Sequence, residues 1–244
     1  QESIQGTQWW TSYQPVSYKL DSKLGTEAEF KNMIKQCNAV GVDIIADVVL
    51  NQTTGADVAD GKQTGVAGTE YNGSTGDYPG FATEQYPEGI TASDFHSCSK
   101  NISNYANQQE VQECRLSSMW DFDSESEKVQ DIQSDYLAAL WNAGVRGFPM
   151  GADKHIHTDS MKAIKEKFAK KIGVNADSIY WIQEVIGNSS EAAGIQPSNY
   201  VQNGTVTEFG FKSEMNQTFK DKIANLKGLN ERLSKDLASE DANV

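Results

Sequence analysis

The sequence has 244 residues, of which 38% are hydrophobic and 23% charged, and its net charge is −13. This composition is typical of a soluble globular chain with enough residues for one large domain or two small ones. Such acidity argues against nucleic acid or an anionic membrane as a partner, and no apolar run reaches the roughly 18 residues that could span a bilayer. Neutral substrates and metal cations are compatible with this negative charge. The chain starts at Gln1 without a visible signal peptide, so we expect a processed chain or a fragment.

The first third of the chain predicts a helix, a strand and a long insertion. Residues 24–41 read as a helix with a capping box of Thr26 and Glu29, and Gly41 ends it. Residues 42–50 are a nearly continuous β-branched run, typical of a strand buried on both faces in a parallel sheet. From 53 to about 119, small and polar residues dominate. We expect an irregular insertion there, and loops of this length are usually functional.

Regular patterns return after the insertion. A helix is expected over 124–144, where Ser124 and Glu127 have the spacing of a second capping box. The alternation of helices and short apolar runs predicts an α/β fold with a parallel sheet. The expected elements that follow are strands at 145–150, 178–186 and 205–211, and helices at 159–173 and 213–229.

Polar side chains gather where the expected strands end. In parallel α/β folds, working residues sit at the carboxyl ends of the strands. A carboxylate, amides, a lysine and a histidine at one edge of the sheet suit a sugar or another polar neutral ligand. The residues at these ends are Asp47, Asn51, Gln52, Lys154, His155 and Glu184.

Three of these strand ends resemble signature segments of the α-amylase family of glycoside hydrolases. They are DVVLNQ at 47–52, GFPMGADKH at 147–155 and WIQEV at 181–185. The usual family forms are Asp-x-x-x-Asn-His, Gly-Phe-Arg-x-Asp-Ala-x-Lys-His and a Glu at the end of the fifth strand. GTQWWTSYQPVSYKL at 6–20 and IQPSNY at 195–200 are also similar to family sequence. The resemblance covers essentially the whole chain.

This resemblance implies a partial TIM (β/α)8 barrel. The four expected strands would be its third to sixth, with 1–52 and 121–244 as barrel parts. Residues 53–120 would be the inserted calcium-binding domain. The first two strands, the last two and the segment with the family's third catalytic Asp would lie outside this sequence. We therefore expect the isolated chain to fold poorly, because open sheet edges expose unpaired backbone groups.

The family reaction is retaining endo-hydrolysis of α-1,4 links in starch, for which two carboxylates are needed. The resemblance makes Glu184 the acid/base; without it, the position favours a strand-end Glu in a structural ion pair. Gly151 falls at the nucleophile position and Pro149 at the family arginine, which argues against chloride as a cofactor. Gln52 replaces a sugar-contacting histidine. Asp153 could act as nucleophile only after a two-residue slip, so we expect no hydrolysis by the chain as written.

Calcium is the cofactor that the resemblance implies. Its expected ligands are the side chains of Asn51 and Asp121 and the main-chain carbonyls of Gln112 and His155, all oxygens that suit this ion. Taken alone, Asp121 could simply be a residue at a helix start.

The sequence has three cysteines. Cys37 lies on an apolar helical face and is expected as a buried thiol. The cysteine count alone allows one disulfide and one free cysteine. Cys98 and Cys114 match a family disulfide, which favours a secreted, extracellular protein.

Sugar contacts are implied for Trp10 and Tyr13 as stacking platforms, and for Gln52, Lys154 and His155 as polar contacts. Trp9 is expected in the core. Starch and maltooligosaccharides are the expected partners. Two alternatives stay open: a non-catalytic amylase-like glucan-binding protein, and a transglycosylase of the same family.

Overall fold

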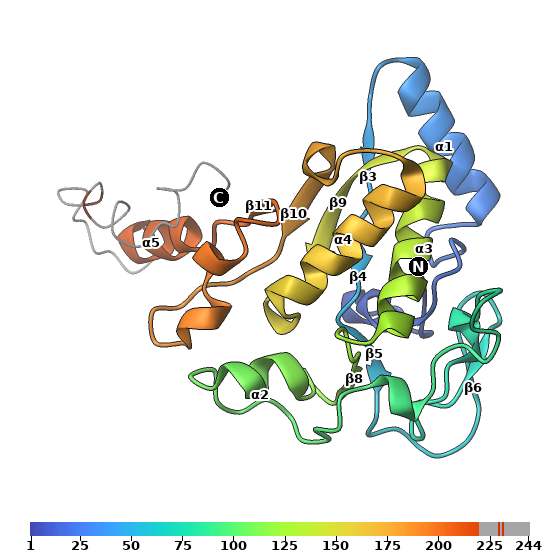
Figure 1. The fold of residues 1–244 in the computed structure, drawn as a ribbon, viewed down its shortest axis with the longest axis horizontal. Helices are drawn as coiled ribbons and strands as arrows, with labels where there is room; N and C mark the ends of the chain where they lie inside the picture. Colours follow the sequence, from blue (N-terminus) through green and yellow to red (C-terminus); the bar gives the residue numbers. More distant parts are fainter. Residues whose placement is uncertain (220–228, 230, 232–244) are drawn as a thin grey trace.

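The computed structural model describes residues 1–219, 229 and 231 (Figure 1). No helix among these residues is long and apolar enough to cross a membrane. The strands are β1 Glu2–Ser3, β2 Pro15–Ser17, β3 Ile44–Ile45, β4 Val48–Val49, β5 Gln52–Gly55, β6 Gln63–Thr64, β7 Glu70–Tyr71, β8 Met119–Asp121, β9 Val145–Gly151, β10 Tyr180–Gln183 and β11 Thr205–Val206. The helices are α1 Glu27–Ala39, α2 Gln108–Glu113, α3 Glu127–Ala143, α4 Thr158–Ile172 and α5 Gly210–Phe219, with short 3-10 turns that include η1 Trp9–Tyr13 and η4 Asp153–His155.

A five-stranded parallel sheet organises the molecule, in the order β11, β10, β9 and then β3 with β4. Both β3 and β4 pair with β9, and Ile182 of β10 lies opposite Pro149 of β9. The predicted α/β fold with a parallel sheet is therefore confirmed. Because all of these strands run the same way, their carboxyl ends meet at one edge.

The β-branched run at 42–50 differs from the expected continuous buried strand. It forms two short pieces, β3 and β4, separated by Ala46 and Asp47. Val48 and Val49 are buried, whereas Ile45 is 50% exposed and Ile44 is half-buried. The prediction of burial on both faces is thus wrong for β3, because hydrophobic pattern alone does not reveal whether a neighbour covers a strand.

The start of α1 is as expected and the start of α3 is not. Thr26 and Glu29 form the predicted reciprocal capping box. The second predicted box is wrong, because Ser126 rather than Ser124 precedes α3 and no side chain caps it. The main-chain N–H of Ser124 instead donates to the carbonyl of Phe122, which places Ser124 in the turn before the helix.

Helices α3 and α4 lie side by side on one face of the sheet (Figure 1). Beneath them is the main apolar core, in which Phe148, Phe168 and Trp181 are almost fully buried and in ring contact. This packing holds β9 and β10 rigidly, so the residues at their ends have fixed positions.

The insertion has no long element, as expected, but its aromatic side chains form a second core together with Val16 and with Val129 and Ile132 of α3. Tyr78, Phe81, Phe95 and Phe122 are buried together there. At its two ends, β5 and β8 pair antiparallel, with Gln52 opposite Asp121. The domain limits of 53 and 120 remain a prediction.

The C-terminal part differs from the sequence expectation. The fourth strand is only β11, and residues predicted as strand from Gly210 onward begin α5. The predicted closing helix at 213–229 coincides with α5 up to Phe219, and its remainder lies largely outside the described residues.

Candidate functional site

A cleft of about 680 Å³ opens at the carboxyl ends of the parallel strands. Its lining combines residues that follow β4, β9, β10 and β11 with the aromatic turn η1. Of the predicted site residues, the cleft gathers Trp10, Tyr13, Gln52, Gly151 and Glu184. The lining also includes Trp9, Asp47, Pro149 and Ala152.

Glu184 directly follows β10 and is fixed against the end of β9. Its main-chain N–H donates to the Met150 carbonyl at 2.9 Å, and its Oε2 accepts from the main-chain N–H of Ala152 at 3.0 Å. Ala152 adopts a left-handed conformation with φ 59°, which is uncommon for a residue with a side chain. The chain turn after Gly151 thus aims a backbone donor at the Glu184 carboxylate.

Gly151 ends β9 within the same cleft and offers no functional group. A Cβ atom at this position would lie 3.9 Å from Oε2 of Glu184. Pro149, two residues earlier, also lines the cleft. Positions two apart on a strand share a face, so neither of the two cleft-facing positions carries a charge or a nucleophile.

The aromatic wall of the cleft comes from η1. Trp9 is 74% exposed and Trp10 is 51% exposed, and their rings meet edge to face. The expectation that Trp9 belongs to the core is therefore wrong: a five-residue 3-10 turn presents both indoles outward. Flat exposed rings of this kind stack on apolar sugar faces at modest entropic cost.

Tyr13 and Gln52 are tied to the lining around them. The Tyr13 hydroxyl donates to Oδ2 of Asp47 at 2.9 Å, and this bond raises the pKa of Tyr13. Nε2 of Gln52 donates to the Tyr13 carbonyl at 3.1 Å. Oε1 of Gln52 is buried without a hydrogen-bond partner among the described residues, so it is an acceptor that a bound hydroxyl could satisfy.

Lys154 and His155 do not belong to the lining that the described residues form. Lys154 is buried, pairs with Glu191 and lies over the Tyr105 ring. Nδ1 of His155 lies 3.0 Å from the Val111 carbonyl, and burial lowers the pKa of His155 to about 4. Their predicted contacts with sugar remain predictions.

Asp153 is also absent from that lining and is 1% exposed. Burial raises its pKa well above the usual range, and neither carboxyl oxygen has a hydrogen-bond partner among the described residues. Asp153 is therefore not brought to the cleft, which disfavours it as a nucleophile there.

The predicted calcium ligands fall on two parts of the structure, each of which brings two of them together. The Asn51 carbonyl accepts from the Phe122 N–H at 3.0 Å, which places Asn51 beside Asp121. Helix α2, which carries Gln112, packs against η4, which carries His155.

The side chains of Asn51 and Asp121 pass a test of fit to a cation. Oδ1 of Asp121 and Nδ2 of Asn51 are buried and lack hydrogen-bond partners among the described residues. A 180° turn of the amide would present oxygen in place of that nitrogen. Burial raises the pKa of Asp121 to about 7, against the lowering effect of His96. A hard cation at these oxygens would satisfy both orphaned groups.

A histidine and carboxylate cluster that the sequence did not suggest lies next to Asp121. Nδ1 of His96 is 2.7 Å from Oδ2 of Asp121, and its Nε2 is 2.8 Å from Oε2 of Glu125. Burial opposes protonation, but these two carboxylates outweigh it and raise the pKa of His96 to about 10. No sequence motif links these positions; the scarcity of histidine, with three in the chain, was the one available signal.

The disulfide between Cys98 and Cys114 is present and closes a loop within the insertion. Cys37 is a free thiol and is half-buried rather than buried, because Met33 and Val40 around it on α1 are themselves exposed.

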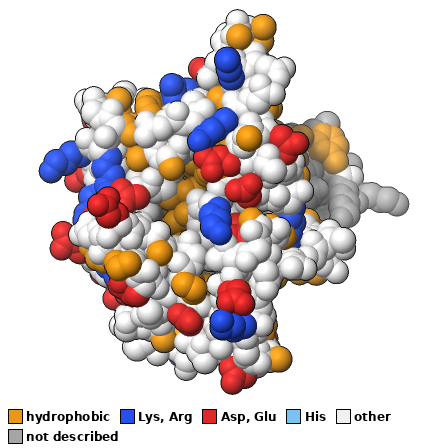
Figure 2. Space-filling model, turned by 90° about the vertical axis from the view of Figure 1, so that its right-hand side faces the viewer, with side chains coloured by type: hydrophobic (Ala, Val, Ile, Leu, Met, Phe, Trp, Pro, Cys, Tyr) orange, Lys and Arg blue, Asp and Glu red, His pale blue; other side chains and the backbone are white. Residues whose placement is uncertain are grey.

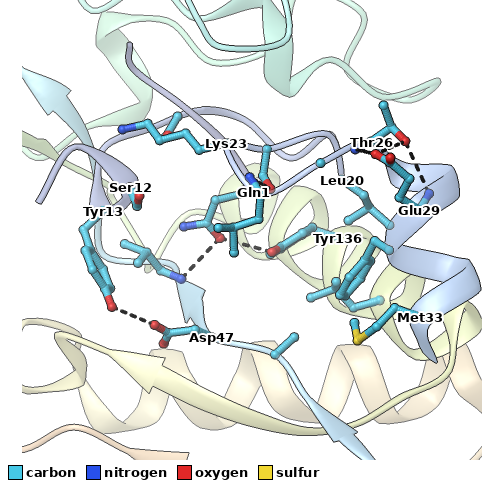
Figure 3. A pocket seen from close by; sticks show the side chains of 18 of the residues that line it. Gln1, Ser12, Tyr13, Leu20, Lys23, Thr26, Glu29, Met33, Asp47 and Tyr136 are labelled. Atoms are coloured by element: carbon cyan, nitrogen blue, oxygen red, sulfur yellow. Dashed lines mark hydrogen bonds between the residues drawn. The ribbon is translucent and has the colours of Figure 1, made fainter. Parts of the chain in front are cut away.

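A second cavity of about 800 Å³ adjoins the cleft and shares Trp9, Tyr13 and Asp47 with it. Figure 3 shows Tyr136 and Gln1 inside it, with the Tyr136 hydroxyl donating to Oε1 of Gln1 at 3.1 Å. Apolar side chains of α1 and β3 form much of the remaining wall. Figure 2 shows apolar side chains near the middle of the corresponding side of the molecule, with acidic and basic side chains interspersed around them.

The fold and the cleft define an α/β protein with an open cleft at the carboxyl ends of parallel strands. The chain matches no family model. It is 36% identical over 232 residues to an α-amylase of Streptomyces violaceus, covering 95% of this chain and 37% of that protein. An α-amylase of Aeromonas hydrophila is 38% identical over 94% of this chain and 47% of its own length.

The solved structures agree with the sequence comparisons. The crystal structure of α-amylase I from Eisenia fetida matches with a TM-score of 0.79 and 33% identity, over 93% of this chain and 46% of that one. A mutant of the same α-amylase I was solved in complex with maltohexaose. This chain belongs to the α-amylase family, and it spans less than half the length of these relatives.

Proposed function

We propose that the cleft binds an α-1,4-glucan and that the chain as written does not cleave it. The aromatic wall of Trp9, Trp10 and Tyr13 and the free acceptor of Gln52 support sugar binding. The absence of cleavage is inferred from Gly151, which lies beside Glu184 where a nucleophile would be required.

Retaining hydrolysis requires two carboxyl groups about 5 Å apart, one as acid/base and one as nucleophile. Glu184 supplies the first, held by the Ala152 N–H. The other acidic side chain of the lining, Asp47, accepts the Tyr13 hydroxyl instead. Transglycosylation proceeds through the same covalent intermediate, so the glycine at 151 disfavours that alternative equally and favours a non-catalytic glucan-binding role.

The parallel sheet supports a partial barrel as the architecture of this chain. We assign β3 with β4, β9, β10 and β11 to the third to sixth strands of a (β/α)8 barrel, with 53–120 as the calcium-binding insertion. Calcium would be held by Asn51, Asp121 and the carbonyls of Gln112 and His155, and would tie the insertion to the strand ends. The disulfide supports a secreted protein, since such bonds persist in oxidising compartments.

Titration with maltohexaose, paired with a reducing-sugar assay on starch, tests the proposal. We expect saturable binding without release of reducing ends, and weaker binding after Trp10→Ala. Glu184→Gln is the matched control for catalysis, because it removes the acid while keeping the shape of the side chain. Turnover that Glu184→Gln abolishes would overturn the absence of cleavage, and absence of binding by the folded parent would overturn the glucan site.

A further inference from the structure

We infer that His96, Asp123 and Glu125 form a second cation site, suited to Zn²⁺, which adjoins the proposed calcium ligand Asp121 but shares no ligand with the calcium site. One donor atom from each of the three lies within 4.8 Å of the others. This inference is independent of the glucan-binding proposal, because none of the three residues lines the cleft.

The backbone fixes the donors before any ion binds. Residues 94–96 run beside residues 121–123: the His96 N–H donates to the Asp121 carbonyl and the Asp123 N–H to the Asp94 carbonyl, both at 3.0 Å. Phe95 and Phe122 between them pack ring on ring in the insertion core. His96 and Asp123 are therefore held as neighbours by main-chain pairing.

Both distances from His96 to the carboxylates lie close to the donor spacing of a tetrahedral ion. Nε2 of His96 is 2.8 Å from Oε2 of Glu125 and 3.8 Å from Oδ1 of Asp123. Zinc bonds of about 2.1 Å in a tetrahedron place neighbouring donors about 3.4 Å apart, between the two observed values. A small opening of the His96–Glu125 contact would admit the ion.

Asp121 orients the His96 ring from the side opposite the proposed ion. Its Oδ2 lies 2.7 Å from Nδ1 of His96, so a proton on Nδ1 directs the Nε2 lone pair toward the carboxylates. Histidines that bind zinc commonly donate their other N–H to a carboxylate in this way. Nε2 of His96 and Oε2 of Glu125 already face each other at 2.8 Å, on either side of the position that the ion would take. An imidazole donor favours zinc over calcium, which prefers oxygen ligands.

The site has room for a fourth ligand. Nε2 of His157 is 3.5 Å from Oε1 of Glu125. The side chains of Asp123, Glu125 and His157 are 38%, 45% and 30% exposed, so an ion can enter from solvent.

Calorimetric titration of the full chain with Zn²⁺, in saturating Ca²⁺ after removal of all metals, tests the inference. We expect one zinc ion per chain and a loss of affinity of at least about tenfold in Asp123→Asn. The matched control is Asp135→Asn, an exposed acid on α3 that pairs with Lys171 and should leave zinc affinity unchanged.

Three results would overturn the site: no zinc binding by the parent, equal affinity in Asp123→Asn and Asp135→Asn, or complete displacement of zinc by Ca²⁺. Glu125→Gln serves as a second variant if Asp123→Asn does not fold. It keeps the length of the side chain while removing the charge that the ion requires, and it should show the same loss.

Discussion

A Cβ atom at position 151 would lie 3.9 Å from Oε2 of Glu184 and 3.5 Å from the Val48 carbonyl oxygen, which are ordinary contact distances. Position 151 thus has room for a side chain. We expect Gly151→Ala to change the free energy of unfolding by less than about 1 kcal/mol, since the added methyl makes only ordinary van der Waals contacts and reduces the entropy of the unfolded chain. Chemical denaturation of the two proteins measures this.

Gly147 on the same strand is the control for that prediction. A Cβ atom there would come within 2.5 Å of Cγ2 of Ile45 and 2.8 Å of Cδ1 of Tyr180. We expect Gly147→Ala to cost about 1–3 kcal/mol by overpacking. If both variants lost the same stability, the cleft at 151 would be closed and our account of the missing side chain would be incorrect.

The stacking role of η1 is tested by Trp10→Ala. Because the indole lines the cleft while 51% exposed, its removal should leave stability nearly unchanged but weaken maltohexaose binding about tenfold, equivalent to roughly 1.4 kcal/mol. Tyr180→Ala is the comparison: Tyr180 is 54% exposed but lies at the opposite end of β10, outside the cleft. Equal effects of the two substitutions would rule out a specific platform.

The proposed calcium ligands make a separate prediction. Asp121→Asn replaces a carboxylate oxygen with no substitute nearby, so calcium affinity should fall by at least about tenfold. Titration of the metal-free chain with Ca²⁺ measures it. Asp135→Asn again controls for the general loss of one negative charge, and an unchanged affinity in Asp121→Asn would move the calcium elsewhere.

The chain order of the fold and the composition of the cleft could be predicted from the sequence. Both depend on local patterns: β-branched runs mark the strands, and parallel strands bring their following residues to one edge. Together with the family resemblance, that logic placed Gly151 beside Glu184, where the structure also has it. It could not show that β3 is half-exposed or that Trp9 points outward, because an apolar residue does not reveal whether another segment covers it.

The cluster around His96 is the clearest case of what sequence patterns leave out. Residues 96 and 125 come together through the pairing of segments 94–96 and 121–123, and His157 arrives from the start of α4. No motif has this spacing, since each residue belongs to a different element. Lys154 and His155 show the converse: a matching motif put them beside the strand end, yet packing against Tyr105, Glu191 and Val111 buries them.

The disulfide should stabilise the insertion. Cys98 and Cys114 are 16 residues apart, and closing a loop of this size is worth about 3 kcal/mol through the entropy of the unfolded chain. We expect the double substitution to Ser to lower the free energy of unfolding by about that amount and Cys37→Ser, at the free thiol, to have little effect. Denaturant titrations compare them; a larger loss in Cys37→Ser would contradict the assignment.

Glu2 provides a test of how the N-terminal segment is held to the insertion. Its buried carboxylate accepts from the hydroxyls of Ser17 and Thr69 and from the main-chain N–H groups of Ala67 and Thr69. Burial alone would raise the pKa of Glu2, but these four donors outweigh it and lower the pKa below 4.5. The unfolded chain therefore binds the proton more readily than the folded one.

The sign of the pH effect follows from this difference. The stabilisation by Glu2 is fully present above the unfolded pKa and is lost as the pH falls through the lower folded pKa. We expect Glu2→Gln to cost about 2 kcal/mol at neutral pH, because a charged acceptor of hydrogen bonds is replaced by an amide, and the gap to the parent protein to close on acidification. Glu27→Gln, which removes an exposed pair with Lys31, should cost little at any pH. Denaturant unfolding measured across acidic and neutral pH decides the matter: a cost of Glu2→Gln that stays constant as the pH falls would show that the carboxylate charge is not what ties β1 to the insertion.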